Sequence, residues 1–263
     1  MKIITWNINS IRLRLPLLRR LASELAPDVI CLQEIKTPEA HFPFSEVSDM
    51  GFVHIALSGM KGYNGVAILS RLPLMEISVR EWCGKKDARH IAATLPDGTR
   101  LHNLYVPAGG DVPDAGENDK FAHKLQFLDE MAEWGAEEKR HPRRILVGDL
   151  NVAPLPEDVW SHRQMLPVVS HTPMETERLV AAQKAGGWID LMRCFTQPEQ
   201  KLYTWWSYRA HDWRASNRGR RLDHIWCSPE VAENARFCMP VPEPRSWDRP
   251  SDHVPVMAEF SLP

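Results

Sequence analysis

Polar side chains interrupt apolar runs of this sequence at three places where packing gives them no role. The segment ILVGDLN carries Asp149 and Asn151, two positions apart, directly after an apolar run. The opening segment TWNIN repeats this spacing with Asn7 and Asn9, and in DVICLQE the residue Glu34 falls in phase with the apolar residues before it. Alternate residues of a strand point to the same face, and burying a lone carboxylate there is costly. We therefore expect these groups to lie at the rim of a sheet, as parts of one site.

Each motif alone has a simpler structural interpretation. An Asp-x-Asn sequence after a strand is usually a turn or a helix cap, and a lone glutamate there is usually solvated or ion-paired. The SDH segment at 251–253 could be a turn before the last strand, and Tyr105 could be a core aromatic residue with its hydroxyl at the edge. No single motif establishes a function, so the prediction has to rest on their combination.

The elements that must position these residues alternate along the chain. Short apolar, β-branched segments predict strands at 2–8, 29–32, 65–69, 91–95, 100–106, 145–147, 222–226 and 254–260. Longer patterns predict helices at about 15–25, 120–138 and 176–185. Strands mixed with helices throughout indicate an α/β protein with buried sheets. No repeat, low-complexity tract or linker divides the chain, so residues 1–263 are predicted to form a single domain.

Composition narrows the class of protein. The 263 residues are 43% hydrophobic and 25% charged, which is typical of a soluble globular protein. The net charge of −2 does not indicate a nucleic-acid partner, although acids elsewhere can offset a local basic face. Five cysteines without a CxxC pair argue against a disulfide framework and against a thiolate zinc site. No signal peptide or membrane-spanning stretch is recognisable, so we expect a cytoplasmic protein.

Taken together and in order, the motifs resemble the exonuclease III family of abasic-site endonucleases and 3′-to-5′ exonucleases. The matching segments cover essentially the whole chain: WNINSIR at 6–12, LQEIK at 32–36, KGYNGVAILS at 61–70, YVP at 105–107, GDLNVAP at 148–154, GWIDLMR at 187–193, YTWWSYR at 203–209, RGRRLDHIW at 218–226 and SDHVPV at 251–256. The resemblance implies the family fold, a four-layer αββα sandwich of two mixed β-sheets packed face to face, as in pancreatic deoxyribonuclease (DNase I-like).

The resemblance also implies magnesium-dependent chemistry, with manganese as an alternative ion. Magnesium prefers oxygen ligands and keeps several waters, so one or two protein carboxylates can suffice. Glu34 matches the family's metal-ligand glutamate, and Asn7 matches a neighbour that helps order the metal site. Asp252 matches a residue near a second metal position.

Other residues match family groups that act on the phosphodiester. Asp149 matches the aspartate that positions or activates the attacking water, and Asn151 would donate a hydrogen bond to the phosphate. His253 matches the phosphate-facing histidine and Asp223 its partner, which would favour the imidazolium form. Tyr105 would hydrogen-bond the phosphate or assist the leaving group.

A basic and aromatic segment indicates where DNA binds. Five arginines lie between Arg209 and Arg221, with Asp212 opposing them, and tryptophans and a tyrosine precede or interleave with them. Arginine neutralises phosphates, and an aromatic face can stack on a base or sugar. The alternative is a solvated loop with buried tryptophans. The expected DNA contacts are Trp205, Arg209, Arg218 and Arg220, extended by Lys124 on the helix predicted at 120–138.

Three positions depart from the family pattern. Ser10 stands where family members usually carry glycine, and Ala108 replaces the amide residue that usually follows the YVP motif. Arg220 stands where the family commonly has tryptophan or leucine, in an apolar pocket for a flipped-out abasic sugar. A charged side chain makes that pocket more polar or changes its shape. We therefore predict weaker abasic-site incision relative to exonuclease activity or 3′-end trimming.

The sequence thus predicts a magnesium-dependent DNA phosphodiester hydrolase of base excision repair, acting as 3′-to-5′ exodeoxyribonuclease, abasic-site endonuclease or both. The expected partner is duplex DNA with an abasic site or a 3′ end; no membrane partner is expected, and the protein is expected to be a monomer. Two alternatives stay open. One is a phosphatase or phosphodiesterase of the same superfamily, and the other is a non-catalytic nucleic-acid-binding regulator, which would be expected to lose site residues.

Overall fold

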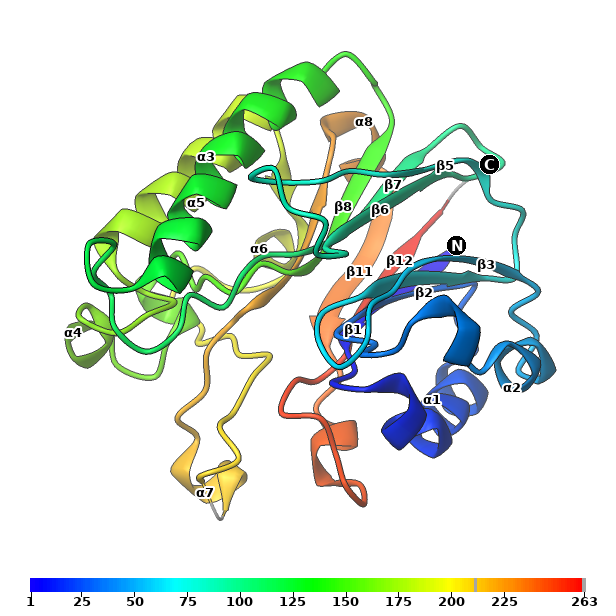
Figure 1. The fold of residues 1–263 in the computed structure, drawn as a ribbon, viewed down its shortest axis with the longest axis horizontal. Helices are drawn as coiled ribbons and strands as arrows, with labels where there is room; N and C mark the ends of the chain where they lie inside the picture. Colours follow the sequence, from blue (N-terminus) through cyan, green and yellow to red (C-terminus); the bar gives the residue numbers. More distant parts are fainter. Residues whose placement is uncertain (211, 262–263) are drawn as a thin grey trace.

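Two six-stranded β-sheets pack face to face in the computed structural model, which describes residues 1–210 and 212–261. Helices cover the outer face of each sheet, so the layers follow the order helix, sheet, sheet, helix (Figure 1). Both sheets are mixed, because each combines one parallel pair of strands with antiparallel neighbours. The four-layer sandwich expected from the resemblance is therefore confirmed.

The first sheet contains both ends of the described chain. Its strand order is β11 (Ala235–Pro240), β12 (Val256–Phe260), β1 (Lys2–Asn7), β2 (Val29–Gln33), β4 (Val66–Ser70) and β3 (His54–Ser58). The helices α1 (Ile11–Leu25) and α2 (Phe44–Asp49) cover it, joined through one buried cluster that includes Ile4, Trp6, Leu18 and Leu32. The parallel pair is β1 and β2, which places Asn7 opposite Gln33.

The second sheet uses the middle of the chain. Its strand order is β5 (Met75–Val79), β6 (His90–Thr94), β7 (Arg100–Tyr105), β8 (Arg144–Asp149), β10 (Asp223–Cys227) and β9 (Ile189–Asp190). Two long helices, α3 (Asp119–Glu138) and α5 (Pro173–Gly186), lie side by side over it (Figure 1). Their apolar faces share a buried cluster with Leu104, Leu146 and Trp226. The parallel pair is β7 and β8.

Shorter elements connect these layers. They are the one-turn helices α4 (His162–Met165), α6 (Leu191–Cys194), α7 (Trp213–Ser216) and α8 (Pro229–Ala232), and the 3₁₀ turns η1 (Glu39–His41), η2 (Pro156–Asp158) and η3 (Glu243–Ser246). Of these, α7 projects farthest from the two sheets (Figure 1).

The central core lies between the sheets and explains why their strands are apolar on both faces. It combines residues of the first sheet, such as Val29 and Ile68, with residues of the second, such as Ile145 and Ile225, all with no exposed surface. A strand that is buried on both faces is expected to have a continuous run of apolar residues in its sequence. Polar residues therefore stand out where such strands end, which is where the motifs lie.

The eight strands expected from the sequence are confirmed to within about two residues, and so are the three helices, with differences at their starts. Helix α1 begins at Ile11, four residues earlier than expected, because a non-helical residue at Arg14 joins two helical segments. The strands β3, β5, β9 and β11 were not predicted. Within the described residues, no helix is long and apolar enough to cross a membrane.

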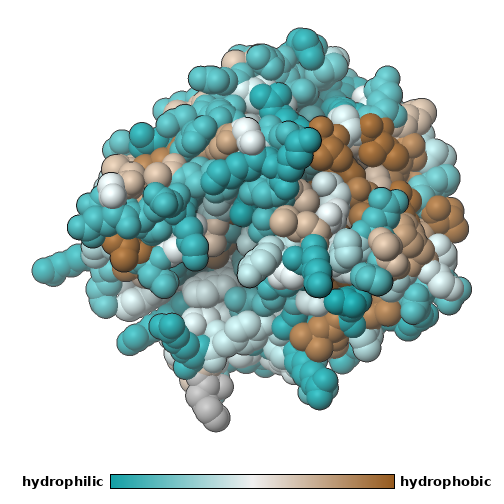
Figure 2. Space-filling view, in the orientation of Figure 1, coloured by the Kyte–Doolittle hydropathy of each residue, from teal (hydrophilic) through white to brown (hydrophobic). Residues whose placement is uncertain are grey.

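Topology brings the polar strand ends to one edge of the sandwich. The strands β1, β2, β7 and β8 all end there, and β10 starts there because it runs antiparallel to β8, with Asp223 opposite Asp149. Hydrophobic residues gather instead over the edge strands β3 and β5 on the other side of the molecule (Figure 2), where Val53, Met75 and Ile77 are exposed.

Candidate active site

A cavity of about 650 Å³ opens where these strand ends meet. Acidic and polar residues from the strand ends line one part of it, namely Glu34, Tyr105, Asp149, Asn151, Asp252 and His253. Arginines and tryptophans line the other part, including Trp160, Trp205, Arg209, Arg218 and Arg220. The structure therefore brings together groups that lie up to 219 positions apart in the sequence, Glu34 and His253 being the extremes.

Glu34 is the centre of a hydrogen-bonded group at the end of β2. Its Oε1 accepts hydrogen bonds from Asn7 Nδ2 at 3.0 Å and from the Tyr105 hydroxyl at 2.8 Å, and its Oε2 lies 2.7 Å from Lys36 Nζ. The backbone at Glu34 is left-handed, with φ 50°. This turn directs the carboxylate into the cavity, so Glu34 reaches the site by leaving the strand pattern rather than by continuing it.

Asp149, at the end of β8, is buried and held by amide donors. Its Oδ2 accepts from Asn7 Nδ2 at 2.8 Å and from Asn151 Nδ2 at 3.2 Å, and its Oδ1 accepts from the Asn151 backbone N–H at 3.0 Å. Asn151 has φ 54°, so it faces Asp149 through a left-handed turn and not along a continued strand. Its second amide hydrogen is donated to Val106 O at 2.9 Å. The expected contact with a phosphate therefore requires Asn151 to release one of these bonds.

Asn7 orders two carboxylates by donating hydrogen bonds to them, and its side-chain oxygen is bound elsewhere. Its amide nitrogen donates to both Glu34 and Asp149, while its Oδ1 accepts from the backbone N–H of Asn9 at 3.1 Å. The expected role of Asn7 as a neighbour that orders the metal site fits this geometry.

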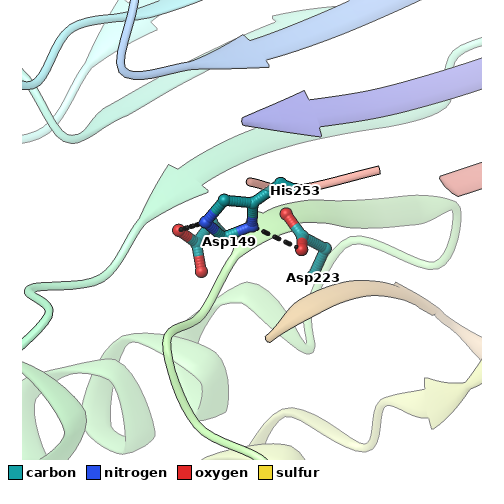
Figure 3. A group of neighbouring side chains, drawn as sticks. All are labelled: Asp149, Asp223 and His253. Carbon is teal, nitrogen blue, oxygen red and sulfur yellow. Dashed lines mark hydrogen bonds and ion pairs between the residues drawn. The ribbon is translucent and has the colours of Figure 1, made fainter. Parts of the chain in front are cut away.

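His253 lies between two aspartates (Figure 3). Its Nδ1 is 2.8 Å from Asp223 Oδ2, and its Nε2 is 3.6 Å from Asp149 Oδ2. Trp6 Nε1 holds the main chain of His253 by donating to its carbonyl oxygen at 3.2 Å. Asp223 has no exposed surface, so the imidazole closes the cavity wall in front of it.

Burial and neighbouring charges move the pKa values of this centre apart. Burial raises the pKa of Asp149 to about 7, with the Asp223 and Glu34 charges acting in the same direction and His253 opposing them. Burial opposes protonation of His253, but the carboxylates of Asp223 and Asp149 outweigh it and raise the pKa of His253 to about 10. At neutral pH His253 is therefore an imidazolium beside a carboxyl group that titrates.

Two further groups keep one protonation state across neutral pH. Burial opposes ionisation of Glu34, but Lys36 and the hydrogen bonds from Asn7 and Tyr105 hold its pKa below the ordinary value. Burial, together with the Glu34 and Asp149 charges, holds the pKa of Tyr105 well above its usual range. Glu34 is therefore a carboxylate and Tyr105 a neutral hydrogen-bond donor.

The donor set suits a hard divalent cation, because oxygen ligands predominate. Within the described residues, one group of three acidic or histidine side chains has ligand atoms within 4.8 Å of one another, and it consists of Asp149, Asp223 and His253. Glu34 faces the same cavity and is linked to Asp149 through Asn7. A few carboxylates around a cavity with room for water are the surroundings that such a cation accepts.

Asp252 lies at the rim and is bound from two sides. Its Oδ2 accepts from Trp205 Nε1 at 2.9 Å, and its Oδ1 accepts from Asn9 Nδ2 at 3.2 Å. It lines the cavity but stands outside the group formed by Asp149, Asp223 and His253. A role near a second metal stays a prediction.

Arg220 lies against the face of Trp205 in the cavity wall, with its guanidinium carbon 4.9 Å from the ring centre. Its Nη1 donates to Val169 O at 3.1 Å and to Ser170 Oγ at 3.0 Å. The place expected for an apolar pocket is thus occupied by a stacked and hydrogen-bonded cation. Arg218 repeats the arrangement on Trp160 at 4.7 Å, and both Arg218 and Arg209 are exposed at the mouth.

The expectation that Lys124 contacts DNA was wrong. Its side chain has no exposed surface, because it lies on the inner face of α3 and its ammonium is bound by Glu175 and by main-chain oxygens. Arg221 is likewise not part of a basic surface. It is fully buried and ion-paired with Asp158 and Asp190, which lie far from it in the sequence.

The two other departures from the family pattern have clear structural settings. Ser10 has φ 86°, a backbone conformation that favours glycine, directly before α1. Ala108 is exposed and lines the cavity, so the polar contact of an amide side chain is missing there.

Sequence reasoning missed a buried polar layer beneath the site. Gln33 donates to Asn103 Oδ1 at 2.7 Å and to Thr5 Oγ1 at 2.9 Å, and Asn103 in turn donates to the carbonyls of Leu32 and Ala67. These bonds join the two sheets directly under Asn7 and Tyr105. In the sequence, Thr5 and Asn103 are polar residues inside predicted strands, and Gln33 directly follows the strand predicted at 29–32.

Comparisons with known proteins agree with this geometry. The sequence profile described as the Endonuclease/Exonuclease/phosphatase family matches residues 4–253. The chain is 30% identical to exodeoxyribonuclease III of Haemophilus influenzae over 271 residues, covering 99% of this chain and 100% of that one. Among solved structures, it is similar to an AP endonuclease from Archaeoglobus fulgidus (31% identity, TM-score 0.91). It is also similar to a 3′ phosphatase from Neisseria bound to a product DNA hairpin (34% identity, TM-score 0.92), and both likenesses cover 100% of each chain.

Proposed function

This chain belongs to the Endonuclease/Exonuclease/phosphatase family, as a nuclease of the exonuclease III and AP endonuclease type, and we propose that it hydrolyses phosphodiester bonds at DNA 3′ ends and abasic sites with magnesium. We place this activity in base excision repair. The observation that carries the proposal is the buried centre of Asp149 between Asn7, Asn151 and the His253–Asp223 pair, facing a cavity lined with arginines.

Glu34 would hold the magnesium ion, with Asn7 ordering it and manganese as an alternative ion. Glu34 offers a carboxylate into the cavity, and Asn7 fixes both this carboxylate and that of Asp149. Once bound, the ion would neutralise charge on the phosphate oxygens.

Asp149 would position the attacking water and accept its proton. A group with a pKa of about 7 is ionised in a large fraction of molecules at neutral pH and still basic enough to accept a proton. Asn7 and Asn151 fix the direction of its oxygens. Water access is restricted to the cavity, because Asp149 itself is 1% exposed.

The phosphate itself would lie against His253. The imidazolium form that Asp223 favours places a positive N–H at the cavity wall, where it stabilises charge developing on the phosphate oxygens. Asn151 would add a hydrogen bond after releasing Val106 or Asp149. Tyr105, a neutral phenol, would donate to the phosphate or to the leaving oxygen.

Trp205, Arg209, Arg218 and Arg220 would bind the DNA around this centre. Arg209 and Arg218 are exposed at the cavity mouth, and the helix α7 between them extends the surface away from the sheets (Figure 1). Exposed arginines suit contacts with phosphates, and half-buried Trp205 offers a face for stacking only where Arg220 does not cover it.

A second candidate activity is removal of a 3′-terminal phosphate. The observation that favours it is Arg220, a cation fixed in the cavity where a neutral abasic sugar would otherwise lie. A terminal phosphate carries more negative charge than a phosphodiester, and it suits a guanidinium. The similar Neisseria protein is described as a 3′ phosphatase. The regulator alternative is not favoured, since Glu34, Asp149, Asn151, Asp252 and His253 line the cavity and Asp223 binds His253 from behind.

A cleavage assay with the wild type and Glu34→Gln tests the proposal. Wild-type protein is incubated with a 3′-recessed, 5′-labelled duplex in magnesium and, separately, in chelator. We expect shortening of the labelled strand in magnesium alone, and a higher magnesium requirement for Glu34→Gln. Cleavage that persists in chelator, or a magnesium requirement unchanged in Glu34→Gln, would contradict the assignment of the metal site.

A further inference from the structure

Lys124 is a fully buried lysine whose ammonium group has three protein acceptors. Its Nζ lies 2.5 Å from Glu175 Oε1, 2.7 Å from Asn151 O and 3.3 Å from Ala108 O. Its aliphatic stem passes over Gly109, where an added Cβ would lie 2.8 Å from Lys124 Cδ. The chain therefore provides both a path for the stem and a complete set of partners for the charge.

Two of these acceptors belong to loops that carry expected site residues. Asn151 has a left-handed backbone, and the ammonium binds its carbonyl oxygen while its side chain faces Asp149. Ala108 lies three residues after Tyr105, in the loop that leaves β7. Asparagine adopts the left-handed backbone conformation more readily than most residues, and the bond from Lys124 to the Asn151 carbonyl oxygen holds the turn in place.

The third acceptor extends the connection to the opposite cavity wall. Glu175 accepts from the backbone N–H of Ser170 at 2.9 Å and from the Thr172 hydroxyl at 2.6 Å. Ser170 Oγ in turn accepts from Arg220. One buried ion pair between α3 and α5 thus connects the loop of Asn151 with the wall that holds Arg220.

We propose that Lys124 and Glu175 are positioning residues, which set the geometry of Asn151 and of the Ser170–Arg220 wall for hydrolysis. The inference rests on the proposed nuclease function. A positioning role differs from a purely structural role in one consequence. Catalysis then needs the contacts that the two charged groups make, whereas folding needs only that neither charge is buried without its partner.

Three variants separate these roles. Lys124→Met keeps the stem and removes the ammonium, leaving Glu175 as an uncompensated buried charge. Lys124→Met/Glu175→Gln removes both charges with little change of shape. Arg144→Met is the matched control, because Arg144 is a buried cation that binds the main chain at the other ends of α3 and α5, through Lys139 O, His141 O and Gly186 O.

The measurements are kcat and KM for 3′-end hydrolysis, and Tm. We expect Lys124→Met to lower Tm and to lower kcat by about 100-fold, the size of effect that a misplacement of about 1 Å produces, with KM changed less than kcat. In the double variant Tm should recover while kcat stays low. Arg144→Met should lower Tm and leave kcat within about threefold of the wild type.

Each other outcome has a clear meaning. If kcat recovers with Tm in the double variant, or if Arg144→Met lowers kcat as much as Lys124→Met, the pair is only structural and the inference is wrong. If Lys124→Met does not fold, the kcat of the double variant decides. If the wild type hydrolyses no 3′ end at all, the proposed function is wrong. If the wild type is active and Lys124→Met is equally active, the inference alone is wrong.

Discussion

At the scale of single residues, the centre depends on two groups, Asp149 and His253, whose pKa values are both raised. Burial is the main cause that raises the pKa of Asp149 to about 7, and the surrounding carboxylates raise the pKa of His253 to about 10. Asp149 must be ionised to accept a proton, and His253 must stay protonated to stabilise negative charge. Both conditions hold at pH values between these two pKa values. The predicted working state is a carboxylate beside an imidazolium.

This arrangement predicts a bell-shaped pH dependence of kcat/KM. Below pH of about 7 the rate should fall about tenfold per unit, because the ionised fraction of Asp149 falls by that factor. Toward pH of about 10 the rate should fall again as His253 loses its proton. Initial rates of 3′-end hydrolysis measured across this range, at constant ionic strength and magnesium, provide the test.

Asp223→Asn serves as the control for the alkaline side. The Asp223 carboxylate is the strongest of the charges that raise the pKa of His253, so its removal should move the alkaline fall to lower pH. A wild-type profile that is flat through neutral pH, or an alkaline side that Asp223→Asn does not move, would contradict these assignments.

Arg220 predicts a difference in substrate preference. Arg220→Trp restores an apolar wall beside Trp205 and should raise incision at an abasic-site analogue relative to 3′-end trimming by about tenfold, within the range that pocket contacts provide. The ratio of the two kcat/KM values is the measurement. Arg214→Trp adds the same side chain at an exposed position of α7 and should leave the ratio unchanged. No gain with Arg220→Trp would contradict the specificity argument.

The sequence predicted the polar residues of the centre better than the buried ion pair and the turns that hold them in place. Asp149, Asn151 and Glu34 were found because they stand at the ends of apolar runs, where burial without a partner is costly. Lys124 was misplaced because helix periodicity does not say which charged residue on a helix meets a buried partner, and Glu175 lies 51 positions away. The turns that aim Glu34 and Asn151 also escaped prediction, since a strand pattern implies no left-handed residue.

At the scale of elements, the strands predicted from the sequence are those whose residues are buried, and exposed strands were missed. The strands found were those with buried faces, such as β8, in which every residue is buried. The strand β5 is exposed at all five positions and is interrupted by a register shift next to Glu76. The strand β11 pairs irregularly between Ala235 and Phe237 and is half exposed. Apolar periodicity reports burial, so edge strands that bury little surface leave a weak pattern.

The parallel pair β7 and β8 depends on one glycine. Gly148 pairs with Leu104, and a Cβ at Gly148 would lie 1.9 Å from the Leu104 carbonyl oxygen. We expect Gly148→Ala to lower the free energy of unfolding by more than about 3 kcal/mol, because strand β8 must then move away from β7 beside Asp149. Denaturant or thermal unfolding gives the measurement.

Gly98→Ala is the matched control for this prediction. Gly98 also has a positive φ, at 82°, but an added Cβ would meet no atom within 4 Å. Backbone strain alone should then cost about 1 to 2 kcal/mol. Equal losses in the two variants would show that the close approach of the strands has no effect of its own.

At the scale of the whole molecule, a net charge of −2 coexists with a cationic cavity mouth. Arg209 and Arg218 are expected to contact DNA phosphates, so Arg209→Ala and Arg218→Ala should each weaken DNA binding and reduce the slope of log K against log salt by about one. Arg236→Ala is the control and should leave the slope unchanged, because Arg236 is exposed and lies near Met1 and Ser261, away from the cavity. Binding is measured in chelator, so that no substrate is consumed.

The organisation of the chain as one domain also belongs to this scale. The central core takes residues from both sheets, and β12 returns to pair with β1, so the last strand completes the first sheet. We propose a single folding unit over residues 1–263, which should unfold in one cooperative transition. The monomeric state and the cytoplasmic location stay predictions from the sequence.

The central claim is that the Asp149 centre hydrolyses DNA phosphodiesters at 3′ ends. One measurement tests it most directly: mapping the products that the wild type and Asp149→Asn form, in magnesium, from a duplex with a recessed 3′ end and from one with an internal abasic analogue. We predict a ladder shortened from the 3′ end, weaker incision beside the abasic analogue, and loss of both in Asp149→Asn. Folded wild-type protein that cleaves neither duplex, or Asp149→Asn that cleaves as fast as the wild type, would contradict the claim.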